Sequence, residues 1–343
     1  MAPIPSASPL PRLITYFQTH HDSDGNAISV LPLVTQPGIS LTHLILAAIH
    51  INDDPAALTL NDHHPSHPRF QTLWAELRVL QASDIKVMGM LGGAAKGSYE
   101  RLDGSDEQFE RYYTPVRDLI REHALDGLDL DVEEETSLGG IIRLIDRLRS
   151  DFGPAFIITL APVAAAMLDS TKNLSGFDYE TLEVMRGKDI AWYNTQFYCG
   201  WGDCSNPFMY NMMQYKGWRP EKLVIGLVTN PENGNGFVPF EMLGGVLNVL
   251  GATHGKQFGG VMGWEYFNSM PGGRERPWEW AKFMTGLLRG RSLSLIEPEK
   301  EVEHEKKEEK TKAGVEIDGD SPDGPPSQLP KAFEYHSEGL EED

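Results

Sequence analysis

Short apolar runs recur along the chain, and longer segments with helical periodicity separate them. Eight runs rich in β-branched and aliphatic residues predict strands, at residues 13–17, 43–51, 86–91, 128–132, 156–161, 191–198, 223–228 and 260–264. Apolar side chains at i, i+3 and i+4 spacing predict helices between them, at residues 70–81, 107–123, 141–149, 240–250 and 278–289. Alternating strands and helices are typical of parallel βα units. Eight units over roughly 280 residues predict one closed (β/α)8 TIM barrel, an α/β fold, at residues 12–291.

The composition changes just after Arg291. The segment 292–343 is rich in Glu, Lys, Pro and Gly and has few apolar residues, so it has no face to pack on a core. We therefore expect a disordered acidic C-terminal tail. Residues 297–343 hold 16 acidic and 6 basic side chains, which places −10 of the formal net charge of −20 in this segment. The barrel itself is only moderately acidic.

The acidic balance argues against a nucleic-acid partner, because phosphate neutralisation needs clustered Lys and Arg. No run of about 18 apolar residues occurs, and the N-terminus lacks the basic and apolar regions of a secretory signal. These observations predict a cytoplasmic protein that does not insert into a membrane. Cys199 and Cys204 are too few for a disulfide framework, and two free thiols or one short-loop disulfide both fit their spacing.

Acidic residues alternate with apolar ones in the segment 125–135, LDGLDLDVEEE. Alternate side chains of a strand point to one face, so Asp129, Asp131 and Glu133 face the barrel interior, while Asp126 belongs to the turn before the strand. Carboxyls spaced about 6.6–7 Å apart on a buried strand cannot all ionise, so at least one holds a proton near neutral pH. A protonated carboxyl beside charged ones suits general acid catalysis. Glu133, nearest the mouth, is the candidate proton donor.

Residues 126–133 match the pattern DGxDxDxE, and here the sequence resembles glycoside hydrolase family 18, the chitinases and endo-β-N-acetylglucosaminidases. Residues 90–93, MLGG, resemble the family's SxGG motif with Met in place of Ser. Residues 196–198, QFY, resemble its QxY motif on the sixth strand. Cys199 replaces the Asn that often follows in plant-type chitinases, which weakens a direct transfer of chitin specificity. The resemblance extends over residues 12–290.

The resemblance implies substrate-assisted catalysis, without a cofactor or a metal ion. Glu133 would protonate the glycosidic oxygen while the acetamido group of the sugar attacks its own anomeric carbon, and water would open the oxazolinium ion with retention. Asp131 would hold the acetamido N–H and Tyr198 would orient the acetamido oxygen. Asp129 would share a proton or a hydrogen bond with Asp131.

Four further residues are candidates for substrate binding. Trp264 ends the eighth predicted strand, where the family places a tryptophan under the reacting sugar. Asn194 and Gln196 share one strand face with Tyr198 by the same alternation. Tyr16 on the first strand could also line the pocket.

Within this family we expect an endo-β-N-acetylglucosaminidase that cuts the chitobiose core of N-glycans. A cytosolic chain meets glycoprotein glycans rather than polymeric chitin, and the connection 228–260 is too short for a lobe that walls the cleft. A chitinase acting on chitin or chito-oligosaccharides is the alternative. A non-catalytic carbohydrate-binding barrel is a different class, against which the acid at Glu133 argues. A metal-dependent barrel enzyme would instead use the acidic row as ligands.

Histidines and aspartates gather in the segment 50–67, after the second predicted strand. Their spacing does not set a ligand group on one element, and the prolines among them indicate an irregular loop. We expect a substrate-side loop here rather than a metal site. Trp201, Trp218 and Tyr210, near the sixth predicted strand, are compatible with either sugar stacking or core packing.

Overall fold

The computed structural model describes residues 10–290, so the tail predicted at 292–343 lies outside the described residues. Eight parallel strands close into a barrel, because the first pairs with both the second and the last. The barrel strands are β1 (Arg12–Phe17), β2 (His43–His50), β4 (Lys86–Gly92), β5 (Gly127–Asp131), β6 (Ile157–Leu160), β7 (Trp192–Gln196), β8 (Leu223–Val228) and β9 (Gly260–Trp264). A short β3 (Thr59–Leu60) pairs antiparallel with β2. The predicted (β/α)8 barrel is confirmed.

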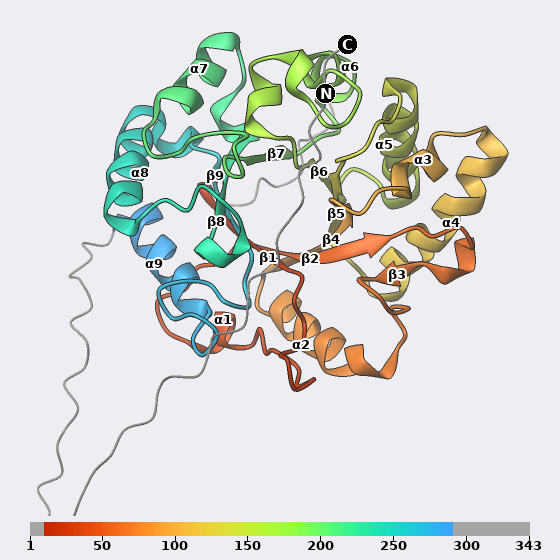
Figure 1. The fold of residues 1–343 in the computed structure, drawn as a ribbon, viewed down its shortest axis with the longest axis horizontal. Helices are drawn as coiled ribbons and strands as arrows, with labels where there is room; N and C mark the ends of the chain where they lie inside the picture. The colour runs from red at the N-terminus through yellow and green to blue at the C-terminus, as the bar shows by residue number, and fades with distance from the viewer. Residues whose placement is uncertain (1–9, 291–343) are drawn as a thin grey trace, which may run out of the picture. The chain divides into compact units, whose positions relative to one another are not determined.

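Helices form the outer ring around these strands (Figure 1). All five predicted helices are present, as α2 (Gln71–Ala82), α4 (Asp106–Glu122), α5 (Leu138–Phe152), α8 (Phe240–His254) and α9 (Trp278–Leu288). The structure adds α1 (Pro32–Thr35), α3 (Ser98–Leu102), α6 (Tyr179–Arg186) and α7 (Phe208–Lys216). These four helices are only four to nine residues long. They contain too few repeats of the apolar spacing to be predicted from the sequence.

The barrel strands are buried on both faces, which explains why their sequences read as apolar runs. One layer of side chains packs between the strands and the helices. The other fills the barrel interior and includes Ile14, Ile45, Met88, Val224 and Met262. The interior is therefore a packed core, and a ligand can bind only above it, at an end of the barrel.

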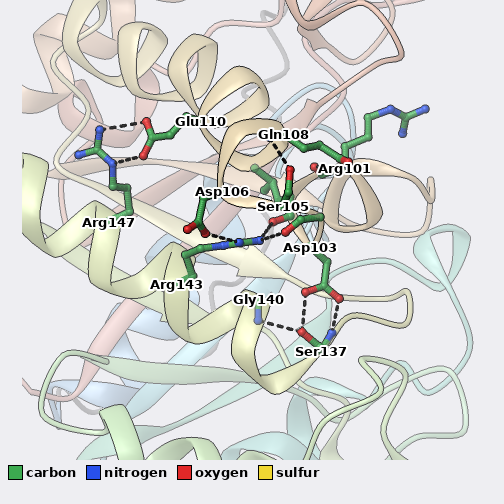
Figure 2. Close-up of polar contacts among 12 residues, drawn as sticks. Arg101, Asp103, Ser105, Asp106, Gln108, Glu110, Ser137, Gly140, Arg143 and Arg147 are labelled. Atoms are coloured by element: carbon green, nitrogen blue, oxygen red, sulfur yellow. Dashed lines mark hydrogen bonds and ion pairs between the residues drawn. The ribbon is translucent and has the colours of Figure 1, made fainter.

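Polar contacts join α5 to α4 and to the turn before α4, and α4 and α5 flank the acidic strand in the chain. Nη1 of Arg143 donates to Oδ1 of Asp106 at 3.0 Å (Figure 2). Ser137 caps the start of α5 and donates its backbone N–H to Oδ2 of Asp103 at 2.7 Å. The cap lies four residues after Glu133. These contacts therefore fix the far end of the short loop that carries the candidate acid.

Within residues 10–290, no helix combines the length and the apolar character needed to cross a membrane. Cys199 is exposed and Cys204 is buried, and both are free thiols.

Candidate active site

A cavity of about 430 Å³ lies where the C-terminal ends of the barrel strands meet. Catalytic residues of (β/α)8 barrels come from this end, because the loops after the strands meet there. The side chains that line the cavity include those of Asp131, Glu133, Gln196, Tyr198 and Trp264. Five of the eight sequence-predicted site residues therefore share one cavity.

Asp129 lies below this cavity, inside the barrel, with no solvent exposure. Its carboxylate accepts hydrogen bonds from the Tyr16 phenol at 2.6 Å, the Thr159 hydroxyl at 2.5 Å and the Asn194 amide at 3.0 Å. Burial raises the pKa of Asp129, and the three hydrogen bonds oppose that rise without cancelling it. These donors come from β1, β6 and β7, so three strands hold one carboxylate.

Asp131, two residues further along β5, reaches the floor of the cavity. Burial raises its pKa well above the usual range for an aspartate, and the negative charges of Glu133 and Asp129 raise it further. The proton expected in the acidic row therefore resides on the inner carboxyls, with Asp131 as the strongest holder. Like charges so close favour one shared proton over three ionised groups.

Glu133 lies two residues beyond the end of β5 and is partly exposed in the cavity. The Gln196 amide nitrogen, Nε2, donates to Oε1 of Glu133 at 3.2 Å and lies 3.3 Å from Oδ1 of Asp131. The same nitrogen donates to the Ala161 carbonyl at 3.0 Å. Gln196, at the end of β7, thus fixes Glu133 relative to Asp131 from across β6.

Tyr198 and Trp264 form further parts of the cavity lining. Burial raises the pKa of Tyr198 well above 10, and the charges of Asp131 and Glu133 add to the effect, so the phenol stays protonated and can donate a hydrogen bond. Trp264 is partly exposed, and its ring centroid lies 5.4 Å from that of Tyr16. An exposed indole at the cavity floor can stack against the apolar face of a sugar.

A glycine at position 92 allows β4 to run close to Asp131. A side chain at Gly92 would place its Cβ 2.5 Å from the Asp131 carbonyl oxygen and 2.5 Å from the Tyr99 ring, and φ is +94°. Met90 in the same motif is buried beside Gly93, so the departure from Ser at that position concerns packing. The MLGG segment therefore shapes the cavity wall and carries no reacting group.

Two of the predicted substrate-binding residues lie outside the lining of the cavity. Tyr16 and Asn194 are fully buried beneath the cavity, and both donate to Asp129. They hold the inner carboxylate and do not contact the space where a ligand would bind. Asp129 itself has its oxygens engaged by these donors, and its predicted hydrogen bond to Asp131 is not among those formed within residues 10–290.

The structure also identifies residues that sequence reasoning missed. Glu134 is buried, and its carboxylate accepts the backbone N–H groups of Gly97 at 2.6 Å and Tyr99 at 2.8 Å. Glu265 is buried beside Trp264 and accepts the N–H groups of Gln18 and Thr19, each at 2.8 Å. The only sequence signal for Glu265 is an acidic residue directly after the last strand.

Of the aromatic residues near β7, one is placed for sugar stacking and two pack in the core. Trp201 lines the cavity, whereas Trp218 and Tyr210 are buried in the core.

The segment 50–67 lies at the substrate side, where several of its residues line a second cavity beside the first. In the part of the chain that the structure describes, no three His, Cys, Asp or Glu side chains are grouped so that they could hold a metal ion.

Comparison with known proteins agrees with this geometry. Residues 12–236 match the family described as glycosyl hydrolases family 18. A fungal endo-β-N-acetylglucosaminidase of that family is 52% identical over 82% of this chain and 99% of its own, with a TM-score of 0.79. A chitinase from Aspergillus fumigatus is 57% identical over 80% of this chain and 98% of its own, with a TM-score of 0.74.

A family 18 chitinase from Pseudoalteromonas aurantia is 21% identical over 81% of this chain and 100% of its own, with a TM-score of 0.62, and supports the fold alone. The search of curated proteins returned no match. The family match extends over more than half of the chain, and the acidic strand lies inside it. The protein belongs to glycoside hydrolase family 18.

Proposed function

We propose that this hydrolase cleaves the β-1,4 bond after an N-acetylglucosamine by substrate-assisted catalysis with retention. The observation that carries the proposal is the placement of Asp131 and Glu133 in one cavity, joined by Gln196 and flanked by Tyr198. Glu133 is the more exposed carboxyl of the two, so it is the one that reaches a glycosidic oxygen.

The position of the carboxyls favours a nucleophile supplied by the substrate. A retaining enzyme with its own nucleophile needs two carboxyls about 5–5.5 Å apart that flank the scissile bond. Asp131 and Glu133 are two residues apart in one chain segment, so both approach the sugar from the same side. Burial and neighbouring charge also favour the protonated form of Asp131, which is a poor nucleophile. The acetamido oxygen of the sugar is then the group left to attack the anomeric carbon.

The residues around Glu133 fit the two steps of that reaction. Glu133 donates its proton to the leaving oxygen as the acetamido oxygen bonds to the anomeric carbon, and the oxazolinium ion carries the positive charge. The proton that Glu133 donates is the one that it shares with Asp131, so Asp131 is left ionised, accepts a hydrogen bond from the acetamido N–H and stabilises the positive charge. Glu133 then takes a proton from the water that opens the ring.

The chitobiose core of N-glycans is the substrate that we propose first. Its support is the similarity to the fungal endo-β-N-acetylglucosaminidase and a second cavity of about 610 Å³ beside the first, with Gln18, His50 and Ala95 in the walls of both, which gives room for a bulky glycan. A cytoplasmic location, expected from the sequence, would bring the enzyme to glycans of misfolded glycoproteins. Chitin or chito-oligosaccharides are the second candidate, supported by the 57% identity to the Aspergillus fumigatus chitinase.

One assay separates the two candidates. The protein is incubated with a high-mannose glycoprotein and, separately, with a chito-oligosaccharide, and the released sugars are analysed by mass spectrometry. Release of a glycan with one N-acetylglucosamine at its reducing end supports the first candidate, and shortened chito-oligosaccharides support the second. Failure to cut either substrate would contradict the proposed function.

A further inference from the structure

The acid Glu133 receives little support from its own side chain. It is partly exposed, and within residues 10–290 its carboxylate takes part in a single hydrogen bond, from the Gln196 amide at 3.2 Å. It also lies two residues beyond the end of β5, so the pairing with β4 that fixes Asp131 does not extend to it. The place of the acid therefore depends on how the rest of its loop, residues 132–136, is held.

The next residue in that loop, Glu134, is buried and lies outside the lining of the catalytic cavity. Each of its carboxylate oxygens accepts one backbone N–H, Oε2 from Gly97 at 2.6 Å and Oε1 from Tyr99 at 2.8 Å. A buried carboxylate is costly unless it is hydrogen-bonded, and bonds to a charged acceptor are about twice as strong as those between neutral groups. The two N–H groups therefore fix the Glu134 side chain, and with it the backbone beside Glu133.

Both partners of Glu134 belong to the segment between β4 and the first turn of α3. Residues 93–95 of this segment line the catalytic cavity, and Gly97 ends it with a φ of +111°. Ser98 is buried and accepts the Ile51 N–H at 3.0 Å, which fixes the segment to the chain that follows β2. Glu134 thus ties the loop of the acid to a part of the cavity wall that has its own attachment to the barrel.

A backbone contact holds the loop from the other side, where β6 lies next to β5. The Thr136 N–H donates to the Ser175 carbonyl at 2.9 Å, in the chain between β6 and α6. In the described part of the chain, Glu134 is the one residue of 132–136 whose side chain bonds the segment between β4 and α3. The loop therefore has an attachment on each side of β5, and the one on the β4 side depends on a side chain that can be replaced.

We propose that Glu134 is a positioning residue, which holds the loop of Glu133 against the cavity wall and so keeps the acid in line with the leaving oxygen and close to Asp131. The inference rests on the proposed function, because it takes Glu133 as the proton donor. Glu134 itself does not touch the substrate and transfers no proton. Its effect follows from the steep dependence of catalysis on geometry, since a displacement of about 1 Å can cost about 10²-fold in rate.

Glu134→Gln in the full-length chain tests the inference, because the amide oxygen can accept one backbone N–H while the amide NH₂ group faces the other. Rates are measured on two glycosides of N,N′-diacetylchitobiose, one with phenol and one with dinitrophenol as the leaving group. Phenol leaves slowly without a proton, whereas dinitrophenol leaves as a stable anion and needs no acid. We expect kcat/KM to fall about 10- to 100-fold for the phenyl glycoside and less than about twofold for the dinitrophenyl glycoside.

Asp126→Asn is the matched control. Asp126 precedes β5 at the opposite end of the same strand, and its carboxylate accepts the Val87 N–H at 2.9 Å and the Gln81 amide at 3.1 Å. It also joins a carboxylate to β4, but at the end of the strand away from the cavity. The control should lower the melting temperature as Glu134→Gln does and leave the ratio of the two rates unchanged. An equal loss for both glycosides in Glu134→Gln, or no loss, would overturn the positioning role.

The pH–rate profile is the second measurement, on whichever glycan the parent cleaves in the assay above. The charge of Glu133 raises the pKa of Asp131, so an acid displaced from Asp131 raises that pKa by a smaller amount, and the profile of Glu134→Gln should move to lower pH. The profile of Asp126→Asn should stay in place. A Glu134→Gln profile that also stays in place would count against the inference and leave the proposed function intact, whereas a parent that cleaves neither glycan would contradict the proposed function itself.

Discussion

The phenol of Tyr16 donates a hydrogen bond of 2.6 Å to Oδ2 of Asp129, across the inside of the barrel. The two residues are 113 positions apart in the chain, on β1 and β5. Neither is exposed to solvent, and the Tyr16 ring also packs against Trp264. One side chain thus supports both the inner carboxylate and the indole at the cavity floor.

Tyr16→Phe should test this link, because it keeps the ring and removes the donor. A buried acceptor that loses a partner costs about 1–3 kcal/mol of unfolding free energy, which chemical denaturation measures. The loss should also raise the pKa of Asp129, since its hydrogen bonds lower that pKa. Asp129 then carries less negative charge and raises the pKa of Asp131 by a smaller amount than in the parent. The pKa of Asp131 is therefore lower in the variant, and the pH–rate profile should move to lower pH.

Tyr99→Phe is the control for this variant. Its hydroxyl is also buried, but it donates to the Leu91 carbonyl at 2.7 Å rather than to a carboxylate. It should destabilise the protein by a similar amount without moving the pH–rate profile. A profile that shifts equally in both variants would contradict the specific role of Tyr16.

Glu133→Gln preserves the shape of the side chain and can keep its contact with Gln196, but it has no transferable proton. Turnover should fall by about 10² to 10⁴, the usual contribution of general acid catalysis, while glycan affinity persists. Glu135→Gln is the matched control, since Glu135 is exposed in the same loop. Steady-state kinetics and calorimetry measure the two effects. Turnover close to that of the parent would show that another group supplies the proton.

Asp131→Asn should block formation of the oxazolinium ion, because an amide cannot take the negative charge that Asp131 holds once the shared proton has moved to Glu133. A ready-made sugar oxazoline bypasses that step, so the variant should still transfer the sugar to an acceptor through Glu133 as base and scarcely hydrolyse the product. Chromatography of the transfer product measures this. A glycosyl adduct on Asp131 of the parent, seen by mass spectrometry, would refute the substrate-assisted mechanism.

The same variant should change how stability depends on pH. Because the pKa of Asp131 is higher in the folded state than in the unfolded chain, the folded state binds more protons between the two values. The contribution of Asp131 to the free energy of unfolding is fully present below the ordinary aspartate pKa of about 4. It is lost as the pH rises through the raised pKa. Asp131→Asn should therefore be more stable than the parent near neutral pH, with a flatter slope. Equal slopes in denaturation series would contradict the raised pKa.

Glu265 should hold the end of β1 against the end of β9. Its carboxylate accepts the N–H groups of Gln18 and Thr19 and the Thr19 hydroxyl, all at 2.8 Å. Glu265→Gln turns one acceptor into a donor that faces these groups, so unfolding free energy should fall by about 1–3 kcal/mol and KM should rise as Gln18 shifts. Glu275→Gln, at an exposed site in the next loop, is the control and should change neither quantity.

The sequence by itself determined the barrel and the acidic row. Eight apolar runs predict eight strands because buried strands need apolar side chains on both faces, wherever they lie. The alternation in the acidic segment placed Asp129, Asp131 and Glu133 on one face, since a strand has a period of two in any context. Asp126 lies before β5 as expected, and its carboxylate accepts the Val87 N–H at 2.9 Å.

Only the tertiary structure decided how deep each of these side chains lies. Tyr16 and Asn194 share the inward face with residues that reach the cavity, but the closure of the barrel places them below it. Burial and like charge, which no local pattern encodes, concentrate the proton on Asp131. Glu134 and Glu265 gain their roles from backbone groups of loops distant in the chain. Periodicity fixes the direction of a side chain, whereas depth and partners depend on which strands meet.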